Sequence, residues 1–543
     1  MKLAVRRNLD AIRVRIAQIL VWGVLCFGFS RTPSAAAQAD QPGSPDLTGY
    51  WTLRIPTGDG VFLESYIQIN QTGEAISGTI SGRGPNGTPI AGTFRDGNIH
   101  FATVRSAAPA RAGATLGIGF RQQVYDGTFQ GGKLVLQTQN RQGTVQGVAE
   151  KTTREAALPP APLPLPALRD LPDNGLVRTP PMGWNSWNKF AGRITDADVR
   201  AMADAMVASG MRKFGYVYIN IDDTWEGGRD SAGNIVSNKK FPDMKALADY
   251  VHSKGLKIGI YSSPGPKTCA GYEGSFGHEV QDARTFAAWG IDYIKYDLCS
   301  ARNIYTSSPE NLQGLYQKMG DALQNSGRPI VYSLCEFGNG DVWKWSAKTG
   351  GNLWRTSGDI RDDWASMDRI GFSQISIASF NRPGHWNDPD MLEIGNGGMT
   401  ADEYRTHMSL WSLLSAPLIA GNDLRDMTDE TRSILMNPEV IAIDQDPAAK
   451  PVQVLSQQGS VEILWRALQD GAVVVGMFNR GGDAIEAGFS RSSLNLSTSG
   501  DRIQARDLWK HHPVPVTGDK YVATIPPHGV VLLLVSQTRS HRQ

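Results

Sequence analysis

Acidic side chains recur through the middle of the chain, and each follows a short apolar run. Carboxylates gathered in one cleft can act as nucleophiles or exchange protons with a substrate. The sequence has no cluster of histidines at ligand spacing and no Cys-x-x-Cys motif, so we expect this chemistry to need neither a metal nor another cofactor. The acidic residues are Asp222, Asp223, Asp297, Glu336, Asp359, Asp388 and Asp390.

Asp297 and Asp359 fit the two roles that glycoside hydrolysis requires, an ionised nucleophile and a proton donor. In the strand-like run YIKYD, Lys295 and Asp297 share one face, so the cation can favour the ionised carboxylate. A purely structural Lys–Asp pair is the alternative for this run. Asp359 follows the flexible Gly358 and lies four residues after Arg355, which suits a proton donor.

Two other classes of function fit parts of this pattern. Lys295 could form a Schiff base, as in an aldolase-like lyase, but the adjacent Asp297 would keep its amine protonated. An inactive sugar-binding barrel would be expected to lack one of the two carboxylates, yet Asp297 and Asp359 are both present. Hydrolysis of a glycoside is therefore the favoured interpretation.

Strand-like apolar runs alternate with helix patterns, and this order predicts how the acidic residues are positioned. The alternation over residues 179–447 matches the size and rhythm of an α/β fold, the (β/α)8 TIM barrel. Active sites of that fold lie at the carboxyl ends of the strands, where the acidic residues and Tyr261 fall. An open doubly wound sheet is disfavoured because no glycine-rich phosphate motif follows the first run. The runs span residues 181–185, 216–223, 257–263, 293–299, 330–336, 352–359, 385–392 and 416–421.

The segments around this region differ from it in composition. Short alternating runs with turn-forming Asp-Gly and Gly-Gly pairs predict an N-terminal all-β module, either a sandwich or a barrel. Its aromatic residues Trp51, Tyr66 and Phe101 could form a sugar-binding face, but packing in a core is the favoured interpretation. β-type runs also predict a C-terminal β domain. The expected parts are a signal peptide at 1–39, the N-terminal module at 40–157, a Pro-rich linker at 158–178, the barrel at 179–447 and the C-terminal domain at 448–543.

The chain of 543 residues has 54 Lys and Arg against 53 Asp and Glu, a net charge of +1. Nucleic-acid-binding proteins usually have a basic surface, so we expect no nucleic-acid partner. Residues 1–39 combine early basic residues, an apolar run at 16–29 and small residues at 34–39, the pattern of a signal peptide. We expect export to the periplasm or the medium, with no membrane attachment after cleavage. The oligomeric state stays open.

Residues 179–447 closely resemble glycoside hydrolase family 27, the family of α-galactosidases (melibiases) and α-N-acetylgalactosaminidases. The resemblance covers about half of the chain, and its motifs follow one another in the family's order. They are TPPMGWNSWN, NIDDTW, YVHSKGLKIGIYSSPGPKTCAGYEGSFG, DYIKYDLC, VYSLCEFG, WRTSGDIRDDW, WNDPDML and IAIDQDP. The resemblance implies a (β/α)8 barrel followed by an antiparallel β-sandwich domain.

The resemblance also implies a mechanism and a set of site residues. It implies a retaining double displacement in which Asp297 is the nucleophile and Asp359 the acid/base. Tyr261 and Glu336 join the expected site because they end strand-like runs, and Cys335 because it resembles the cysteine that faces the sugar's 2-position. The family's galactose-binding side chains correspond to Trp187, the platform under the sugar, and to Asp222, Asp223, Lys295, Arg355, Asp390 and Met391.

The cysteines and the sugar-facing segment refine these expectations. Cys269 and Cys299 match the positions of the family's disulfide, and export would allow them to be oxidised. The Cys-Glu-Phe sequence at Cys335 replaces the small residues expected where an N-acetyl group must fit, which favours galactose. The expected partner is a galactose-containing oligosaccharide or polysaccharide. A β-L-arabinopyranosidase or an α-N-acetylgalactosaminidase of the same family remains an alternative.

Overall fold

The computed structural model of the chain describes residues 45–81, 87–104, 122–140, 143–494, 502–516 and 520–538. The expected signal peptide, residues 1–39, lies outside the described residues. From Asp46 onward the described residues belong to one compact unit. Nowhere in these ranges is a helix long and apolar enough to span a bilayer.

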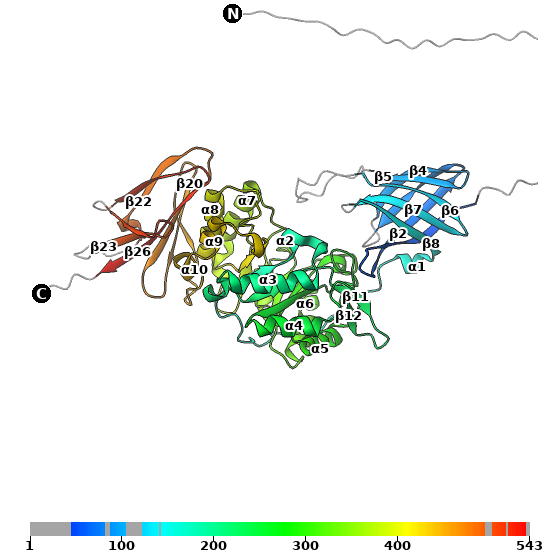
Figure 1. The fold of residues 1–543 in the computed structure, drawn as a ribbon, viewed down its shortest axis with the longest axis horizontal. Helices are drawn as coiled ribbons and strands as arrows, with labels where there is room; N and C mark the ends of the chain where they lie inside the picture. The colour runs from blue at the N-terminus through cyan, green and yellow to red at the C-terminus, as the bar shows by residue number, and fades with distance from the viewer. Residues whose placement is uncertain are drawn as a thin grey trace, which may run out of the picture. The chain divides into compact units, whose positions relative to one another are not determined.

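The described N-terminal strands form a closed antiparallel barrel in which each strand pairs with the next and β1 pairs with β8 (Figure 1). Alternating side chains fill its interior, as the period of two along a strand requires. Trp51 and Phe101 lie in this core and are fully buried, so the core interpretation is confirmed for both. The strands are β1 (Gly49–Pro56), β2 (Phe62–Thr72), β3 (Ala75–Ser81), β4 (Thr88–Arg95), β5 (Asn98–Thr103), β6 (Val124–Gln130), β7 (Lys133–Asn140) and β8 (Gly143–Thr152), and the short helix α1 (Arg154–Ala157) follows.

The central region forms an eight-stranded parallel sheet, and every predicted strand-like run contains one of its strands. The strand order is β17-β16-β15-β14-β13-β10-β9-β18. A parallel bridge between Leu392 and Ala420 joins the segment after β17 to β18, which brings the two outer strands of the sheet together. The strands are β9 (Met182–Asn185), β10 (Tyr218–Asn220), β13 (Lys257–Ser262), β14 (Tyr293–Asp297), β15 (Val331–Cys335), β16 (Leu353–Arg355), β17 (Trp386–Asp388) and β18 (Leu418–Ala420).

Amphipathic helices connect most of these strands and begin at residues that cap them. Thr195, Asp243, Ser308, Asp363 and Thr400 each accept a hydrogen bond from a backbone N–H of the first turn. The connection between β15 and β16 differs from the expected alternation, because it contains only the 3-10 helices η4 (Val342–Lys344) and η5 (Ser346–Thr349). The helices are α2 (Trp187–Phe190), α3 (Asp196–Ala208), α4 (Met244–Ser253), α5 (Glu279–Trp289), α6 (Pro309–Gln324), α7 (Trp364–Ser373), α8 (Ala401–Leu414), α9 (Asp429–Leu435) and α10 (Pro438–Asp444).

The Pro-rich segment at 158–178 contains neither strand nor helix, as predicted. It is packed against the central region that contains the parallel sheet. The Tyr305 hydroxyl contacts the backbone of Leu163, at 2.8 Å from its N and 2.9 Å from its O. The Gln317 side chain, on α6, accepts from the backbone N of Arg169 and donates to the backbone O of Ala167. The segment is therefore a strap fixed along α6 and not a free spacer.

The C-terminal strands form two antiparallel sheets around a separate apolar core. The larger sheet has the order β19-β20-β21-β26-β23-β24, and the smaller pairs β22 with β25. This arrangement agrees with the predicted β-sandwich domain. The strands are β19 (Gln453–Gln458), β20 (Val461–Ala467), β21 (Val473–Asn479), β22 (Ile485–Ser490), β23 (Arg502–Asp507), β24 (His512–Val514), β25 (Lys520–Ile525) and β26 (Val530–Thr538).

Candidate active site

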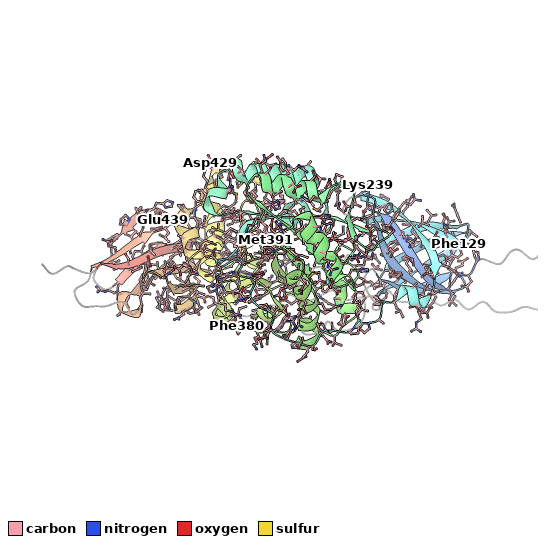
Figure 2. The ribbon with its side chains drawn as sticks, turned by 90° about the horizontal axis from the view of Figure 1, so that it is seen from below. Phe129, Lys239, Phe380, Met391, Asp429 and Glu439 are labelled. Atoms are coloured by element: carbon pink, nitrogen blue, oxygen red, sulfur yellow. A yellow bond between two sulfur atoms is a disulfide. The ribbon has the colours of Figure 1, made fainter. Side chains whose placement is uncertain are left out.

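A cavity of about 550 Å³ opens where the parallel strands end, a size that suits a small ligand. Ten of the twelve residues predicted to act on or bind a sugar line it. Met391, labelled in Figure 2, is one of them. The ten are Trp187, Asp222, Asp223, Tyr261, Lys295, Asp297, Arg355, Asp359, Asp390 and Met391. Residues far apart in the sequence meet here because neighbouring parallel strands bring their carboxyl ends to one edge.

Asp297 is the last residue of β14 and is buried in the cavity. Burial raises the pKa of Asp297, while the positive charge of Lys295 and a hydrogen bond from Tyr261 oppose that rise. The Lys295 ammonium lies 2.9 Å from Asp222 Oδ2, so two carboxylates share one cation. Asp297 lines the cavity, and its Oδ1 has no hydrogen-bond partner among the described residues.

Asp222 and Asp223 reach the same cavity because the chain turns sharply after β10. Thr224 has φ +86°, a strained conformation for a β-branched residue, and it follows Asp223 directly. Asp223 Oδ2 accepts a hydrogen bond from the backbone N of Ala270 at 2.6 Å. Burial raises the pKa of Asp223 to about 7, despite hydrogen bonds from Thr268 and Ala270 that lower it. This turn lets two adjacent aspartates line one cavity.

Arg355, the last residue of β16, holds two acidic side chains of the cavity. Its Nη2 lies 2.7 Å from Asp390 Oδ2 and 3.2 Å from Asp359 Oδ1. Asp390 is buried, and burial raises its pKa although the charge of Arg355 opposes this. The Asp359 side chain is 76 % exposed, in contrast to the buried Asp297. One carboxylate therefore lies deep in the cavity, and another lies in the open part.

A disulfide joins Cys269 to Cys299, as expected from the motif positions. It lies beside the buried carboxylate: the Sγ atoms of Cys269 and Cys299 and a carboxylate oxygen of Asp297 all lie within 4.8 Å of one another. The Tyr261 hydroxyl is 3.2 Å from Cys299 Sγ. The disulfide thus fixes the loop after β13 next to Asp297.

Comparison with known proteins decides the family. The family model described as Alpha galactosidase A matches residues 179–446, and the one described as Alpha galactosidase C-terminal beta sandwich domain matches residues 458–535. An α-galactosidase from Cyamopsis tetragonoloba is 48% identical over 372 residues, which cover 68% of this chain and 89% of that protein. The chain belongs to the α-galactosidase (melibiase) family of glycoside hydrolases.

Solved structures agree with this family assignment. An α-galactosidase from Saccharomyces cerevisiae, solved with raffinose, has a TM-score of 0.63 and 27% identity, covering 68% of this chain and all of that chain. A structure from Bacteroides fragilis NCTC 9343 has a TM-score of 0.63 and 31% identity, covering 87% of this chain and 98% of that chain. The second match covers a larger share of the chain than residues 179–543 make up. It therefore includes residues that precede the α-galactosidase domains.

Two residues predicted to bind the sugar do not line the cavity. Cys335 pairs in register with Asp297 on the neighbouring strand and is fully buried, with its Sγ 3.9 Å from Arg355 Nη1. Burial raises the pKa of the Cys335 thiol, which keeps it neutral. Glu336 is also fully buried, and its Oε1 accepts a hydrogen bond from the backbone N of Gly338. Both are neighbours of residues that line the cavity, Cys335 of Asp297 and Glu336 of Phe337.

Several residues that line the cavity escaped the sequence prediction. Glu393 accepts hydrogen bonds from Asn188 and Asn396, and burial raises its pKa to about 7. It directly follows the motif WNDPDML, two residues after Met391, and this position is a signal that could have found it. The residues missed are Asn188, Lys189, Ala191, Phe337, Ile360, Arg361, Asp362, Glu393 and Asn396.

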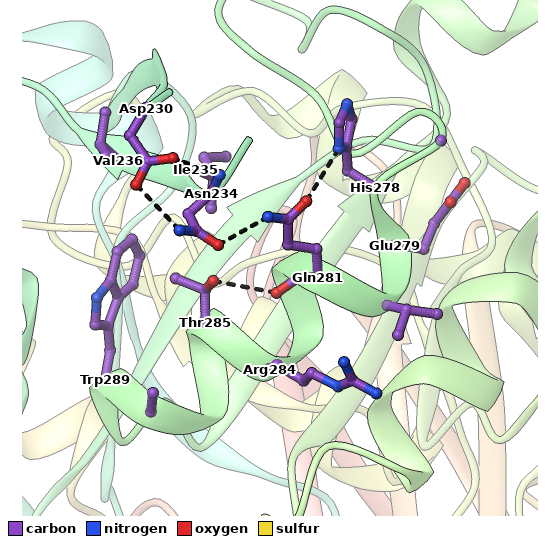
Figure 3. A pocket seen from close by; sticks show the side chains of 13 residues that line it. Asp230, Asn234, Ile235, Val236, His278, Glu279, Gln281, Arg284, Thr285 and Trp289 are labelled. Atoms are coloured by element: carbon purple, nitrogen blue, oxygen red, sulfur yellow. Dashed lines mark hydrogen bonds between the residues drawn. The ribbon is translucent and has the colours of Figure 1, made fainter. Parts of the chain in front are cut away.

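A larger groove of about 810 Å³ lies along α5 and the hairpin of β11 (Glu226–Arg229) and β12 (Ile235–Ser237) (Figure 3). Its polar groups bond mainly to one another. Asn234 donates to Asp230, Gln281 donates to Asn234, and His278 lies 3.3 Å from Gln281 Oε1 (Figure 3). The smaller cavity at the strand ends is therefore the better candidate for catalysis.

Proposed function

We propose that this chain is an exo-acting, retaining α-galactosidase that releases terminal α-D-galactosyl residues from galacto-oligosaccharides, galactomannan or glycoconjugates. The observation that carries the proposal is one cavity that holds the buried Asp297 beside Lys295 and the exposed Asp359. Retaining hydrolysis needs a nucleophile under the sugar ring and a proton donor near the leaving group. The buried and exposed carboxylates fit these two places.

Asp297 and Asp359 act together in two successive displacements at the anomeric carbon. The Asp297 carboxylate attacks the anomeric carbon while Asp359 gives its proton to the departing glycosidic oxygen. This step forms a covalent galactosyl-enzyme and breaks the glycosidic bond. Asp359 then takes a proton from a water molecule, whose oxygen displaces Asp297 from the anomeric carbon. Two inversions return the sugar to its original α configuration.

The remaining cavity residues bind and orient the galactose. Asp223 and Arg355 both line the cavity, and the Asp223 carboxylate and the Arg355 guanidinium supply an acceptor and donors for sugar hydroxyls. Asp222, paired with Lys295, and Asp390, paired with Arg355, supply further acceptors. The half-buried Trp187 offers a flat apolar face for the sugar ring.

A panel of nitrophenyl glycosides tests the proposal. The panel holds the α-galactoside, the α-N-acetylgalactosaminide and the β-L-arabinopyranoside, and NMR follows the configuration of the first product. We expect the α-galactoside to be cleaved fastest, with retention. Faster cleavage of either other glycoside would replace the proposed substrate, and inversion would refute the role of Asp297 as nucleophile. Trapping of a carbonyl substrate by borohydride would instead support a Schiff base at Lys295.

We also propose boundaries for the parts of the chain. The end of β8 and the packed strap support a break near residue 157, and the two family-model matches support a break near residue 447. Limited proteolysis followed by mass spectrometry would locate these boundaries. The parts are a signal peptide at 1–39, the N-terminal module at 40–157, the linker at 158–178, the catalytic barrel at 179–447 and the β-sandwich at 448–543.

Export to the periplasm or the medium completes the proposal. The disulfide between Cys269 and Cys299 supports it, because such bonds persist mainly in oxidising compartments. Expression of the full chain followed by fractionation of the cells tests this location. An N-terminal sequence of the exported protein that begins after Ala37 or Ala39 would support cleavage of the signal peptide. Retention of the full-length chain in the cytoplasm would refute export.

A further inference from the structure

We propose that Asp59, in the N-terminal barrel, is a positioning residue for Asp223 in the galactoside site. Asp59 lies in the loop between β1 and β2 and is only 7 % exposed. The N-terminal barrel would then support the catalytic cavity, a role that its sequence does not suggest. The inference rests on the proposed function where it concerns the bound sugar, and on the contacts alone where it concerns the position of Asp223.

Asp59 contacts two segments of the catalytic barrel at one point. Its Oδ2 accepts from the Tyr272 hydroxyl at 2.8 Å and from Asn238 Nδ2 at 3.4 Å. The Lys240 ammonium lies 3.4 Å from the same oxygen. Its backbone O accepts from the backbone N of Lys239, a residue labelled in Figure 2, at 3.1 Å. These two segments, around 238–240 and around 272, are the ones that lead to Asp223.

The first segment holds the strained turn after Asp223. Lys240 Nζ donates to Thr224 Oγ1 at 2.9 Å, and Asn238 Nδ2 donates to the backbone O of Thr224 at 2.8 Å. Thr224 keeps its positive φ only while its surroundings hold it, because this conformation is unfavourable for a β-branched residue. Two of the side chains that hold Thr224 are thus the ones that Asp59 contacts.

The second segment carries the backbone group that binds Asp223. The backbone N of Tyr272 donates to Thr268 Oγ1, and the backbone N of Thr268 donates to the backbone O of Tyr272. These bonds close a short loop that contains Ala270. The backbone N of Ala270 donates to Asp223 Oδ2 at 2.6 Å. The hydroxyl of Tyr272 therefore connects Asp59 to this loop and, through it, to Asp223.

The charge of Asp59 matters as well as its hydrogen bonds. Burial would raise the pKa of Asp59, but hydrogen bonds from Thr57, Tyr272 and Val61 and the charge of Lys240 outweigh it and lower the pKa. Burial lowers the pKa of Lys240, and Asp59 is the first of the carboxylates that oppose this, before Glu226 and Asp223. Loss of Asp59 leaves the Lys240 ammonium beside Thr224 without its main counter-charge, so Lys240 must move or lose its proton.

Kinetics on the full chain separate positioning from general stability. In Asp59→Ala we expect KM for the nitrophenyl α-galactoside, and Ki for free galactose, to rise about tenfold, because residues in one hydrogen-bond network are energetically coupled. We expect kcat to change much less, because Asp297 and Asp359 stay in place. Asp126→Ala is the matched control, since Asp126 is an exposed aspartate of the same barrel that pairs with His100. Asp59→Asn keeps an acceptor for Tyr272 and is expected to recover part of the loss.

A second variant and a second readout keep the test decisive. Tyr272→Phe removes one hydroxyl and should also raise KM. This variant tests the inference if Asp59→Ala fails to fold. Hydrogen exchange followed by mass spectrometry should show faster exchange of the amides at 268–272 in either variant. Unchanged KM, Ki and exchange in folded variants would overturn the inference. A wild-type chain that cleaves no galactoside would refute the proposed function, while the exchange experiment would still decide whether Asp59 holds the loop at Ala270.

Discussion

Replacing Lys295 by Met tests the electrostatics of the site most directly. The Lys295 ammonium lies 2.9 Å from Asp222, and its charge opposes the effect of burial on the pKa of Asp297. Methionine has a similar length and no charge, so Lys295→Met removes the cation without opening a large space. Without that charge, the ionised form of Asp297 loses its main stabilisation, and we expect the pKa of Asp297 to rise.

The size of the effect follows from Coulomb's law. Lys295 and Asp297 are two positions apart on β14, which places them about 6–7 Å apart. At an effective dielectric constant of about 20, a charge pair at that distance interacts by about 2.5 kcal/mol, or about 2 pKa units. The proposed mechanism needs Asp297 ionised, so activity should appear as pH rises through the pKa of Asp297. We therefore expect the acid limb of the pH profile of kcat/KM to move upward by about 2 pH units in Lys295→Met.

The assay is the pH dependence of kcat/KM for the nitrophenyl α-galactoside in wild type, Lys295→Met and Lys295→Arg. The arginine variant keeps the positive charge, so its acid limb should stay close to that of wild type even if its kcat falls. An acid limb in Lys295→Met that coincides with that of wild type would refute the electrostatic role. Equal and complete loss of activity in both variants would instead favour a covalent role for the Lys295 amine.

Other predictions concern the proton donor, the disulfide and the N-terminal core. In Asp359→Asn, kcat for raffinose should fall by a factor of about 10²–10⁴. It should fall less for a nitrophenyl galactoside, because the nitrophenolate leaving group needs less protonation. Equal losses for both substrates would contradict the role of Asp359 as proton donor. Replacing both Cys269 and Cys299 by Ser opens a loop of sequence separation 30 and should lower the free energy of unfolding by about 3–4 kcal/mol, measured in urea. Trp51→Ala removes a fully buried side chain and should destabilise the N-terminal barrel by about 3–5 kcal/mol, measured by thermal unfolding. Binding to galactomannan should not change. Weaker binding by a folded variant would support a sugar-binding role for this module.

The sequence was most informative where local pattern determines structure. Every predicted strand-like run of the barrel contains a strand, because buried parallel strands are short apolar runs that end in polar residues. The run at 216–223 shows the limit of this pattern, since only Tyr218–Asn220 form β10. The strand ends at Asn220 and the chain turns at Thr224, and an apolar pattern carries no signal for a positive φ. The connection between β15 and β16 also contains a positive φ, at Asp341 directly before η4, which the apolar pattern does not indicate.

Contacts between distant residues were beyond prediction for a different reason. Asp59 and Asn238 are separated by 179 positions, and neither residue type nor local spacing links them. Glu336 ends a strand-like run, as the two carboxylates proposed for catalysis do, yet its side chain is buried outside the lining of the cavity. Which way a side chain points at a strand end depends on the loop that follows, and loops leave weak patterns in a single sequence.

The unpaired atoms of the cavity connect its stability to its selectivity. Buried polar atoms without a partner are rare in folded proteins, and each costs about 1–3 kcal/mol. Asp223 Oδ1, Asp297 Oδ1 and Arg355 Nε are all of this kind among the described residues. A sugar whose hydroxyls match the polar groups of these three residues satisfies their hydrogen bonds, whereas an epimer leaves at least one group unpaired and desolvated. Rigid support of Asp223 would strengthen such a preference, because it prevents the Asp223 carboxylate from finding other partners.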